Sequence, residues 1–194
     1  MAVLAPSQPL TERSATDLAR AIRHRETSSR DVVEAHIERI EFMHERINAV
    51  VVDRFDAARA DADAADDRIV AAADVDELPP FLGVPCTIKE SIAMAGMPNC
   101  AGLVSRQEYR STQSAPTVQR MIDAGAIVLG VTNTPELCLW IETENRVYGR
   151  THNAYSKYRT AGGSSRGEGA VVGSPRRCSR SARSCAAART SGRC

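Results

Sequence analysis

In the first third of the chain, apolar residues recur at the spacing of helices. The segment 15–25 carries an apolar face and is preceded by suitable N-cap residues, Ser14 or Thr16. Ser28 followed by Asp31 is typical of a capping box that starts a second helix. Apolar positions in that second segment again recur at helical spacing, at Val32, Val33, Ile37, Ile40 and Met43.

Further along, apolar runs alternate with turn signals. They predict a strand over 48–55, an exposed helix rich in Ala and Asp over 56–73, a strand over 82–88, a helix over 115–124 and a buried strand over 126–131. A helix followed directly by an apolar strand favours α/β layering. Residues 145–170 show little periodicity, which is typical of a long functional loop.

The composition is that of an ordinary globular protein. Hydrophobic residues make up 43% and charged residues 25% of the 194 residues, a length that allows one domain with its own core. No apolar run approaches the ~18 residues that a membrane span needs. The N-terminus lacks the basic start and long apolar stretch of a secretory signal. These features predict a cytoplasmic protein whose six cysteines need not form disulfides.

Residues 176–194 differ in composition from the rest of the chain. They hold six arginines, no acidic residue and three of the six cysteines, and they lack Leu, Ile, Val, Phe and Met. One interpretation is a basic tail that binds nucleic acid or an acidic surface. The other is a stretch that does not belong to the same protein.

Lys89 is the first candidate for chemistry, and it is one of two lysines in the chain, with Lys157. It ends an apolar strand pattern, where partial desolvation favours the neutral amine. Only a neutral amine can take a proton from a hydroxyl group. The alternative is a strand-end lysine whose ammonium group reaches the solvent.

The run Gly162-Gly163-Ser164-Ser165 is the second candidate. Consecutive glycines permit positive φ and a close approach of the backbone to a ligand, and paired hydroxyls can donate and accept as a proton relay must. A flexible linker is an alternative. A phosphate loop is another, although the Walker pattern is absent.

Four separated motifs together resemble the amidase-signature family, and they occur in the family's order. They are Gly83-Val-Pro-Cys-Thr-Ile-Lys89-Glu-Ser91, Gly130-Val-Thr-Asn-Thr-Pro-Glu136, Val147-Tyr-Gly-Arg-Thr-His-Asn153, and Gly162-Gly-Ser-Ser-Arg-Gly-Glu-Gly-Ala170. The resemblance covers residues 80–174 most strongly. It implies an α/β fold with a mixed central sheet covered by helices, of which this chain holds the first part.

The resemblance also implies a division of the chain and a chemistry. We expect an N-terminal helical region over 1–78, a partial core over 79–175 and a disordered basic tail, outside the family pattern, over 176–194. Family members hydrolyse carboxylic amides with a Ser–Ser–Lys triad and without metal or cofactor. Lys89 would be the base and Ser164 the bridging serine, held on a cis peptide.

The family pattern stops before the nucleophile. That serine normally lies about two dozen residues beyond the bridging serine, in a run like Leu-Gly-Ser/Thr-Asp/Glu-x-x-Gly-Ser. A shifted reading frame over residues 181–188 permits Leu-Gly-Thr-Glu-Leu-Arg-Gly-Ser, with its last serine at position 188. We therefore interpret the tail as a frameshift that truncates the family sequence, and we expect the chain as written to be inactive.

Several alternatives remain at this point. Glu168-Gly169-Ala170 resembles general or fatty-acid-amide-type members more than a glutaminyl-tRNA amidotransferase subunit, which usually has Ser-Ala-Ala there. A non-catalytic product with a true basic tail is a further hypothesis. The expected partner of the intact protein is a small-molecule amide rather than nucleic acid. Arg166 departs from the family, since many members have glycine there, which puts the local geometry in question.

Overall fold

A computed structural model describes residues 8–174 of the chain. The expected basic tail over 176–194 therefore lies outside the described residues. The α-helices are α1 (Ala15–Arg23), α2 (Ser29–Ile47), α3 (Phe55–Ala71), α4 (Pro116–Asp123) and α5 (Arg166–Gly173), and the strands are β1 (Val50–Asp53), β2 (Pro85–Lys89), β3 (Ile127–Thr132), β4 (Glu144–Asn145) and β5 (Gly149–Arg150). Short 3-10 turns include Leu10–Glu12 and Glu136–Cys138.

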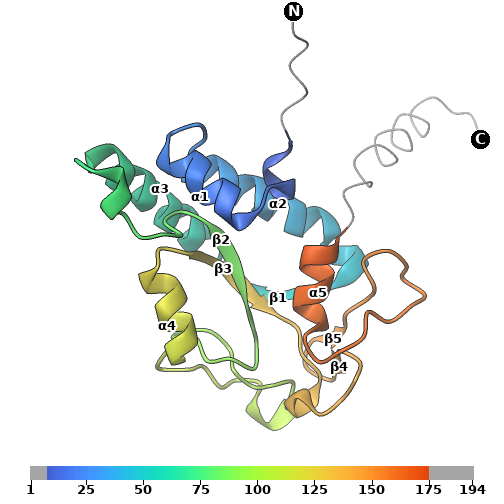
Figure 1. Ribbon diagram of the computed structural model, residues 1–194. Helices are drawn as coiled ribbons and strands as arrows, with labels where there is room; N and C mark the ends of the chain where they lie inside the picture. Colours follow the sequence, from blue (N-terminus) through green and yellow to red (C-terminus); the bar gives the residue numbers. More distant parts are fainter. Residues whose placement is uncertain (1–7, 175–194) are drawn as a thin grey trace, which may run out of the picture.

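A mixed three-stranded sheet forms the centre of the fold (Figure 1). The strand order is β1-β3-β2, with β1 antiparallel and β2 parallel to the middle strand β3. In the second pair Lys89 lies opposite Thr132, at the carboxyl ends of both strands. The α/β class and the mixed sheet predicted from the sequence are confirmed.

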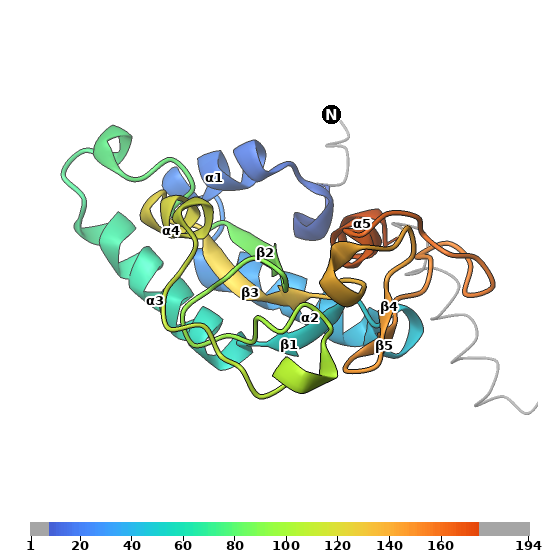
Figure 2. The ribbon, with the colours of Figure 1, turned by 90° about the horizontal axis from the view of Figure 1, so that it is seen from below.

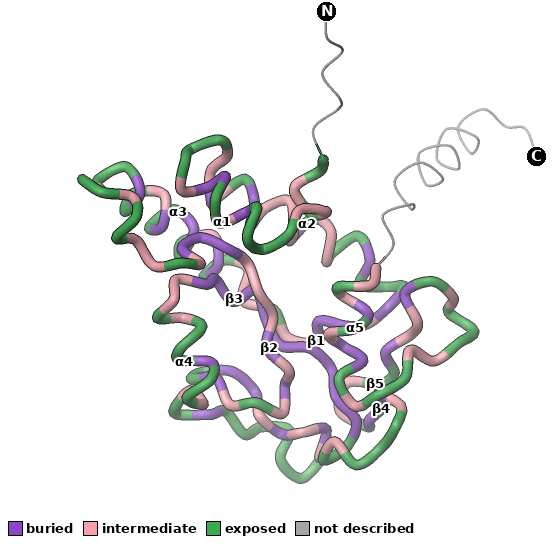
Figure 3. The backbone as a smooth tube through the Cα atoms, in the orientation of Figure 1, coloured by how far each residue is buried: buried purple, intermediate pink, exposed green. Residues whose placement is uncertain are grey.

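Helices cover both faces of this sheet. Ile127 and Leu129 of β3 pack with apolar residues of α1, α2 and α3 in one core cluster. Val128 points to the other face, where it packs with Val118 of α4 and Met97. The helices α1 to α3 accordingly gather on one side of the strands and α4 on the other (Figures 1 and 2). Strand β3 is buried along its whole length between the two layers (Figure 3).

The two predicted N-caps are confirmed. The Ser14 hydroxyl accepts the backbone N–H of Asp17, and the Ser28 hydroxyl accepts that of Asp31. Each bond satisfies one of the N–H groups that the first turn of a helix leaves without a partner. Helix α2 ends at Ile47, and the following residue, Asn48, adopts the left-handed conformation that suits a helix C-terminus.

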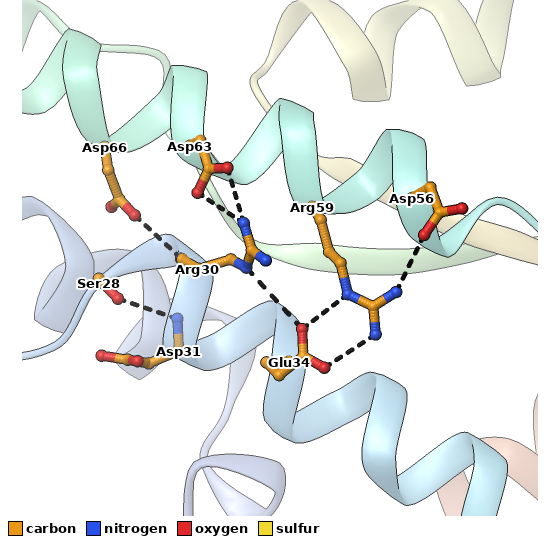
Figure 4. A network of polar contacts seen from close by, with 8 residues as sticks. All are labelled: Ser28, Arg30, Asp31, Glu34, Asp56, Arg59, Asp63 and Asp66. Atoms are coloured by element: carbon orange, nitrogen blue, oxygen red, sulfur yellow. Dashed lines mark hydrogen bonds and ion pairs between the residues drawn. The ribbon is translucent and has the colours of Figure 1, made fainter.

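Helix α3 was expected to be exposed, and this is wrong for one of its faces. Ala58, Ala62 and Ala65 are buried against the core, because their small side chains let α3 pack closely on α2. Its other face forms ion pairs with α2, among them Arg30 with Asp63 and Arg59 with Glu34 (Figure 4). Partly exposed pairs of this kind add at most about 1 kcal/mol each. The alanine face therefore holds the helix in place.

Two further expectations need correction. Strand β2 begins at Pro85 rather than at Leu82, because Gly83 has a φ of +83° and turns the chain just before the strand. Residues 145–170 are not irregular throughout, since they include the β4–β5 hairpin and the start of α5. No described helix is long and apolar enough to cross a membrane.

Candidate active site

The end of strand β2 meets the start of helix α5 at Lys89. The Lys89 Nζ atom donates to the Ser164 Oγ and to the Ser165 Oγ, and both distances are 3.0 Å. Lys89 is half-buried at this point. The fold thus brings the two candidate residues Lys89 and Ser164 into direct contact, and Ser165, the second hydroxyl of the candidate run, contacts Lys89 as well.

A glycine turn places the two hydroxyls. Gly162 and Gly163 have φ values of +78° and +83°, a region that favours glycine. The Gly163 N–H donates to the Ile141 carbonyl at 2.7 Å, and the Thr143 hydroxyl donates to the Gly163 carbonyl at 3.1 Å. All described peptide bonds are trans. The expected cis peptide at Ser164 is therefore absent from the described residues, and the two positive-φ glycines turn the chain just before the serines.

Helix α5 approaches the sheet very closely at Gly167. A Cβ atom at this position would lie 2.6 Å from both the backbone N and the backbone O of Asn133. No side chain other than hydrogen fits such a gap. The contact brings the start of α5 against the segment that follows β3.

Glu168 joins the same helix to both strands that border it. Its Oε2 accepts the hydroxyl of Thr87 on β2 at 2.7 Å, and its Oε1 accepts the hydroxyl of Thr132 on β3 at 2.8 Å. The helix is thus attached to the sheet by side-chain hydrogen bonds as well as by close packing.

On the other side of Lys89, the buried Glu90 organises a loop. Its carboxylate accepts the backbone N–H groups of Cys100 and Ala101, at 2.7 and 2.9 Å, and the Tyr148 hydroxyl at 3.1 Å. Burial of the Tyr148 hydroxyl, together with its contact to Cys100 and the nearby Glu90 charge, raises the pKa of Tyr148. The strand end that carries Lys89 is therefore fixed from both sides.

A thiol also reaches the site. The Cys138 Sγ lies 3.0 Å from the Thr134 Oγ1. Burial alone would raise the pKa of the Cys138 thiol, but hydrogen bonds from Ser91 and Thr134 and the nearby Lys89 charge outweigh it and lower that pKa. Leu137 and Cys138 both have positive φ, an uncommon backbone state for residues with side chains.

Arg166 is the largest fully buried side chain among the described residues. Its Nη2 makes a long contact of 3.4 Å to the Ile141 carbonyl, while its Nε and Nη1 have no hydrogen-bond partner. Burial lowers the pKa of this guanidinium. Arg166, which departs from the glycine expected at this position, is thus buried, and the contact between Lys89 and Ser164 is present beside it.

A cavity lies beside this cluster. It has a volume of about 750 Å³ and opens between α2, β2 and α5, with Thr87 and Glu168 in its wall, but neither Lys89 nor Ser164 lines it. No group of three or more His, Cys, Asp or Glu side chains within residues 8–174 is placed to hold a metal ion.

Comparison with known proteins gives a consistent result. The family model described as Amidase matches residues 31–176. Fatty-acid amide hydrolase 2-A of Danio rerio is 47% identical over 171 residues, and one subunit of the glutamyl-tRNA(Gln) amidotransferase of Acidothermus cellulolyticus is 35% identical over 163 residues. A solved structure of a fatty acid amide hydrolase superposes with a TM-score of 0.81 at 27% identity, over 88% of this chain and 30% of the other. The alignments cover 86% and 84% of this chain but 32% of each relative, so the chain spans about a third of their length.

Proposed function

This chain belongs to the amidase family, and from that premise we propose that Lys89 and Ser164 are the base and the bridging hydroxyl of a centre that hydrolyses carboxylic amides. The observation that carries the proposal is the 3.0 Å contact between the Lys89 Nζ and the Ser164 Oγ. A hydroxyl in direct contact with an amine can pass a proton to it, which is the first requirement of such a centre.

The proposed reaction runs through two half-steps. A serine nucleophile attacks the amide carbonyl carbon, and its proton passes through the Ser164 hydroxyl to the neutral Lys89 amine. The same proton then returns by that route to the departing nitrogen, so that amine leaves and an ester remains on the nucleophile. Water cleaves the ester to a carboxylate, with Lys89 again accepting and returning the proton. Lysine thus takes the role that histidine has in a Ser-His-Asp triad.

Ser165 has a supporting role in this proposal. Its hydroxyl is as close to the Lys89 Nζ as that of Ser164, at 3.0 Å. Two acceptors fix the direction of an amine group better than one does. Ser165 therefore orients Lys89 toward Ser164, and it is a positioning residue rather than a proton carrier.

The proposed substrate of the intact protein is a small-molecule amide. The higher identity to the fatty-acid amide hydrolase than to the amidotransferase, 47% against 35%, supports hydrolysis rather than a role in tRNA amidation. For the chain as written we propose no turnover, because residues 175–194 contain no run of the Leu-Gly-Ser/Thr-Asp/Glu type. Loss of a serine nucleophile lowers kcat by roughly a millionfold.

The test compares two proteins from the same gene. The first is the chain as written, and the second is made by restoring the shifted frame that permits Leu-Gly-Thr-Glu from residue 181 onward. We expect release of amine from a primary carboxylic amide by the second protein, its loss on Lys89→Met, and no release by the first. A normal rate from the chain as written, or full activity of Lys89→Met, would overturn the proposal.

A further inference from the structure

Glu168 has the sequence position of a capping-box residue, but its carboxylate bonds to the sheet instead of capping the helix. Ser165 is the N-cap of α5 and Glu168 is three residues further on, which is the spacing of a capping box. The Ser165 side chain makes no capping hydrogen bond. It contacts Lys89, and the Glu168 carboxylate contacts Thr87 and Thr132 instead. Both polar side chains of the first turn are therefore directed at the sheet.

Two contacts between the start of α5 and β2 lie next to each other. Thr87 and Lys89 are two residues apart, so they lie on the same face of the strand, about 6.6 Å along it. Ser164 directly precedes the N-cap Ser165, and Glu168 lies in the first turn of α5, so both residues are at the same end of the helix. The pair Thr87–Glu168 and the pair Lys89–Ser164 are thus neighbouring contacts along one helix–strand interface.

The second oxygen of Glu168 fixes the position across the sheet. It accepts the hydroxyl of Thr132, which is fully buried and is the β3 residue paired with Lys89. The Glu168 carboxylate therefore contacts Thr87, two positions before Lys89 on β2, and Thr132, which lies beside Lys89 on β3. This determines both the height of α5 along β2 and its distance from β3.

We infer that Glu168 is a positioning residue that sets the register of α5 on β2 and so holds Ser164 and Ser165 against Lys89. The inference rests on the proposed function for its catalytic meaning, while the contact itself is a property of the described chain. Without the carboxylate, the Thr87 and Thr132 hydroxyls lose their short hydrogen bonds to α5, and the packing of Gly167 on Asn133 remains to hold the helix along the strand. A shift of one residue, about 1.5 Å, is enough to break a 3.0 Å hydrogen bond.

The chain offers an internal reference for the test, because Lys89 and Lys157 are its two lysines. Lys157 is exposed on the surface, whereas Lys89 is half-buried and bonded to two serines. The folded chain is treated briefly with acetic anhydride, and peptide mass spectrometry gives the ratio of acetylation at Lys89 to that at Lys157. We expect Glu168→Ala to raise this ratio about fivefold, the effect of losing one ordinary hydrogen-bonded contact.

Conservative and control variants separate positioning from general damage. Glu168→Gln should keep the ratio near that of the unmodified chain, since its amide oxygen accepts one hydroxyl and its NH₂ group donates to the other. Glu108→Ala removes an exposed carboxylate elsewhere and should change nothing. Thr87→Val removes one of the two donors with little change of shape, and should give a ratio between those of the unmodified chain and Glu168→Ala. It also serves as the test if Glu168→Ala fails to fold. A ratio unchanged in both Glu168→Ala and Thr87→Val, or raised equally by Glu168→Gln, would overturn the inference.

A double-mutant cycle distinguishes this inference from the proposed function. Replacing Ser164 and Ser165 by alanine should raise the Lys89 ratio in the unmodified chain, and should have no further effect in the Glu168→Ala background. If the serine replacements have no effect even in the unmodified chain, the Lys89–serine contact and with it the proposed function fail. If they have the same effect in both backgrounds, the positioning role alone is overturned.

Discussion

Lys89 and Ser164 contact each other across 75 residues of sequence, with 3.0 Å between the Nζ and the Oγ. Neither residue is held by its own segment alone. Lys89 depends on the parallel pairing of β2 with β3, and Ser164 depends on the glycine turn that leads into α5. The contact therefore reports whether the helix and the sheet are assembled correctly, and it is sensitive to changes at positions that touch neither residue.

Gly167→Ala tests the close packing of α5 on the sheet. The added methyl group would lie 2.6 Å from the backbone N and O of Asn133, and neither atom can move without disturbing the end of β3. Overpacking at a rigid contact costs about 1–3 kcal/mol. We expect urea unfolding to show a decrease of that size in the free energy of unfolding.

Gly169→Ala is the matched control for this prediction. It lies in the same helix, and a Cβ there would meet nothing within 4 Å. Alanine is also the better helix former, so this variant should be neutral or slightly stabilising. Equal effects of the two substitutions would show that backbone entropy, rather than the contact with Asn133, decides the outcome.

Thiol reactivity provides a second prediction. The thiolate is the reactive form of cysteine. The pKa of Cys138 is lowered by its hydrogen bonds and by Lys89, whereas burial and the nearby Glu168 charge raise the pKa of Cys86 to about 11. At pH 8 we expect iodoacetamide to alkylate Cys138 at least about tenfold faster than Cys86, as measured by peptide mass spectrometry.

Two controls accompany the alkylation experiment. In urea the two rates should converge, because the folded environment of both thiols is lost. In Lys89→Met the Cys138 rate should fall, because the positive charge that favours the thiolate is gone. Equal rates at Cys86 and Cys138 in the folded chain would contradict the prediction.

The sequence predicts best what depends on neighbouring residues. The N-caps Ser14 and Ser28 can be predicted from a few neighbouring residues, because each capping hydrogen bond spans three residues. Glu168 was not recognised as a contact, since its partner Thr87 is 81 residues away and a threonine in a strand carries no signal of its own. Cys138 was missed for a similar reason, because its neighbourhood depends on positive φ values at Leu137 and Cys138.

Resemblance to a family extends the reach of the sequence, but with limits. It predicted that Lys89 and Ser164 share a site, and the two side chains are in contact in this fold. It also implied a cis peptide, which the described residues lack. It indicated that Arg166 is unusual without showing where its side chain goes, because a family motif describes the common residue and not the consequence of its replacement.

The pH dependence of stability provides a third prediction. Burial lowers the pKa of His36 below its usual 6.5, although its Nδ1 contact with the Val32 carbonyl partly offsets this. Below pH 6.5 His36 is protonated in the unfolded chain but stays neutral in the folded chain until the pH falls to its lowered pKa. The free energy of unfolding therefore decreases as the pH falls below 6.5. Above that pH both states are neutral and the effect vanishes.

The prediction is checked by unfolding the chain in urea between pH 7.5 and pH 5.5. The loss of stability over this range should be smaller in His36→Gln than in the unmodified chain. His24→Gln, which changes an exposed histidine, accounts for the number of titrating groups. A slope that is the same in the unmodified chain and in His36→Gln would show that burial does not oppose protonation of His36.

Arg166→Met provides the fourth prediction. A buried guanidinium whose Nε and Nη1 have no partner pays a desolvation cost that no ion pair offsets, while methionine fills a similar volume without charge. We expect the free energy of unfolding to rise by about 1 kcal/mol. Arg120→Met, at an exposed position on α4, should stay within about 0.5 kcal/mol of the unmodified chain. A fall of about 2 kcal/mol in Arg166→Met would contradict the prediction, because it would mean that the folded chain stabilises this charge and that the arginine supports the turn before α5.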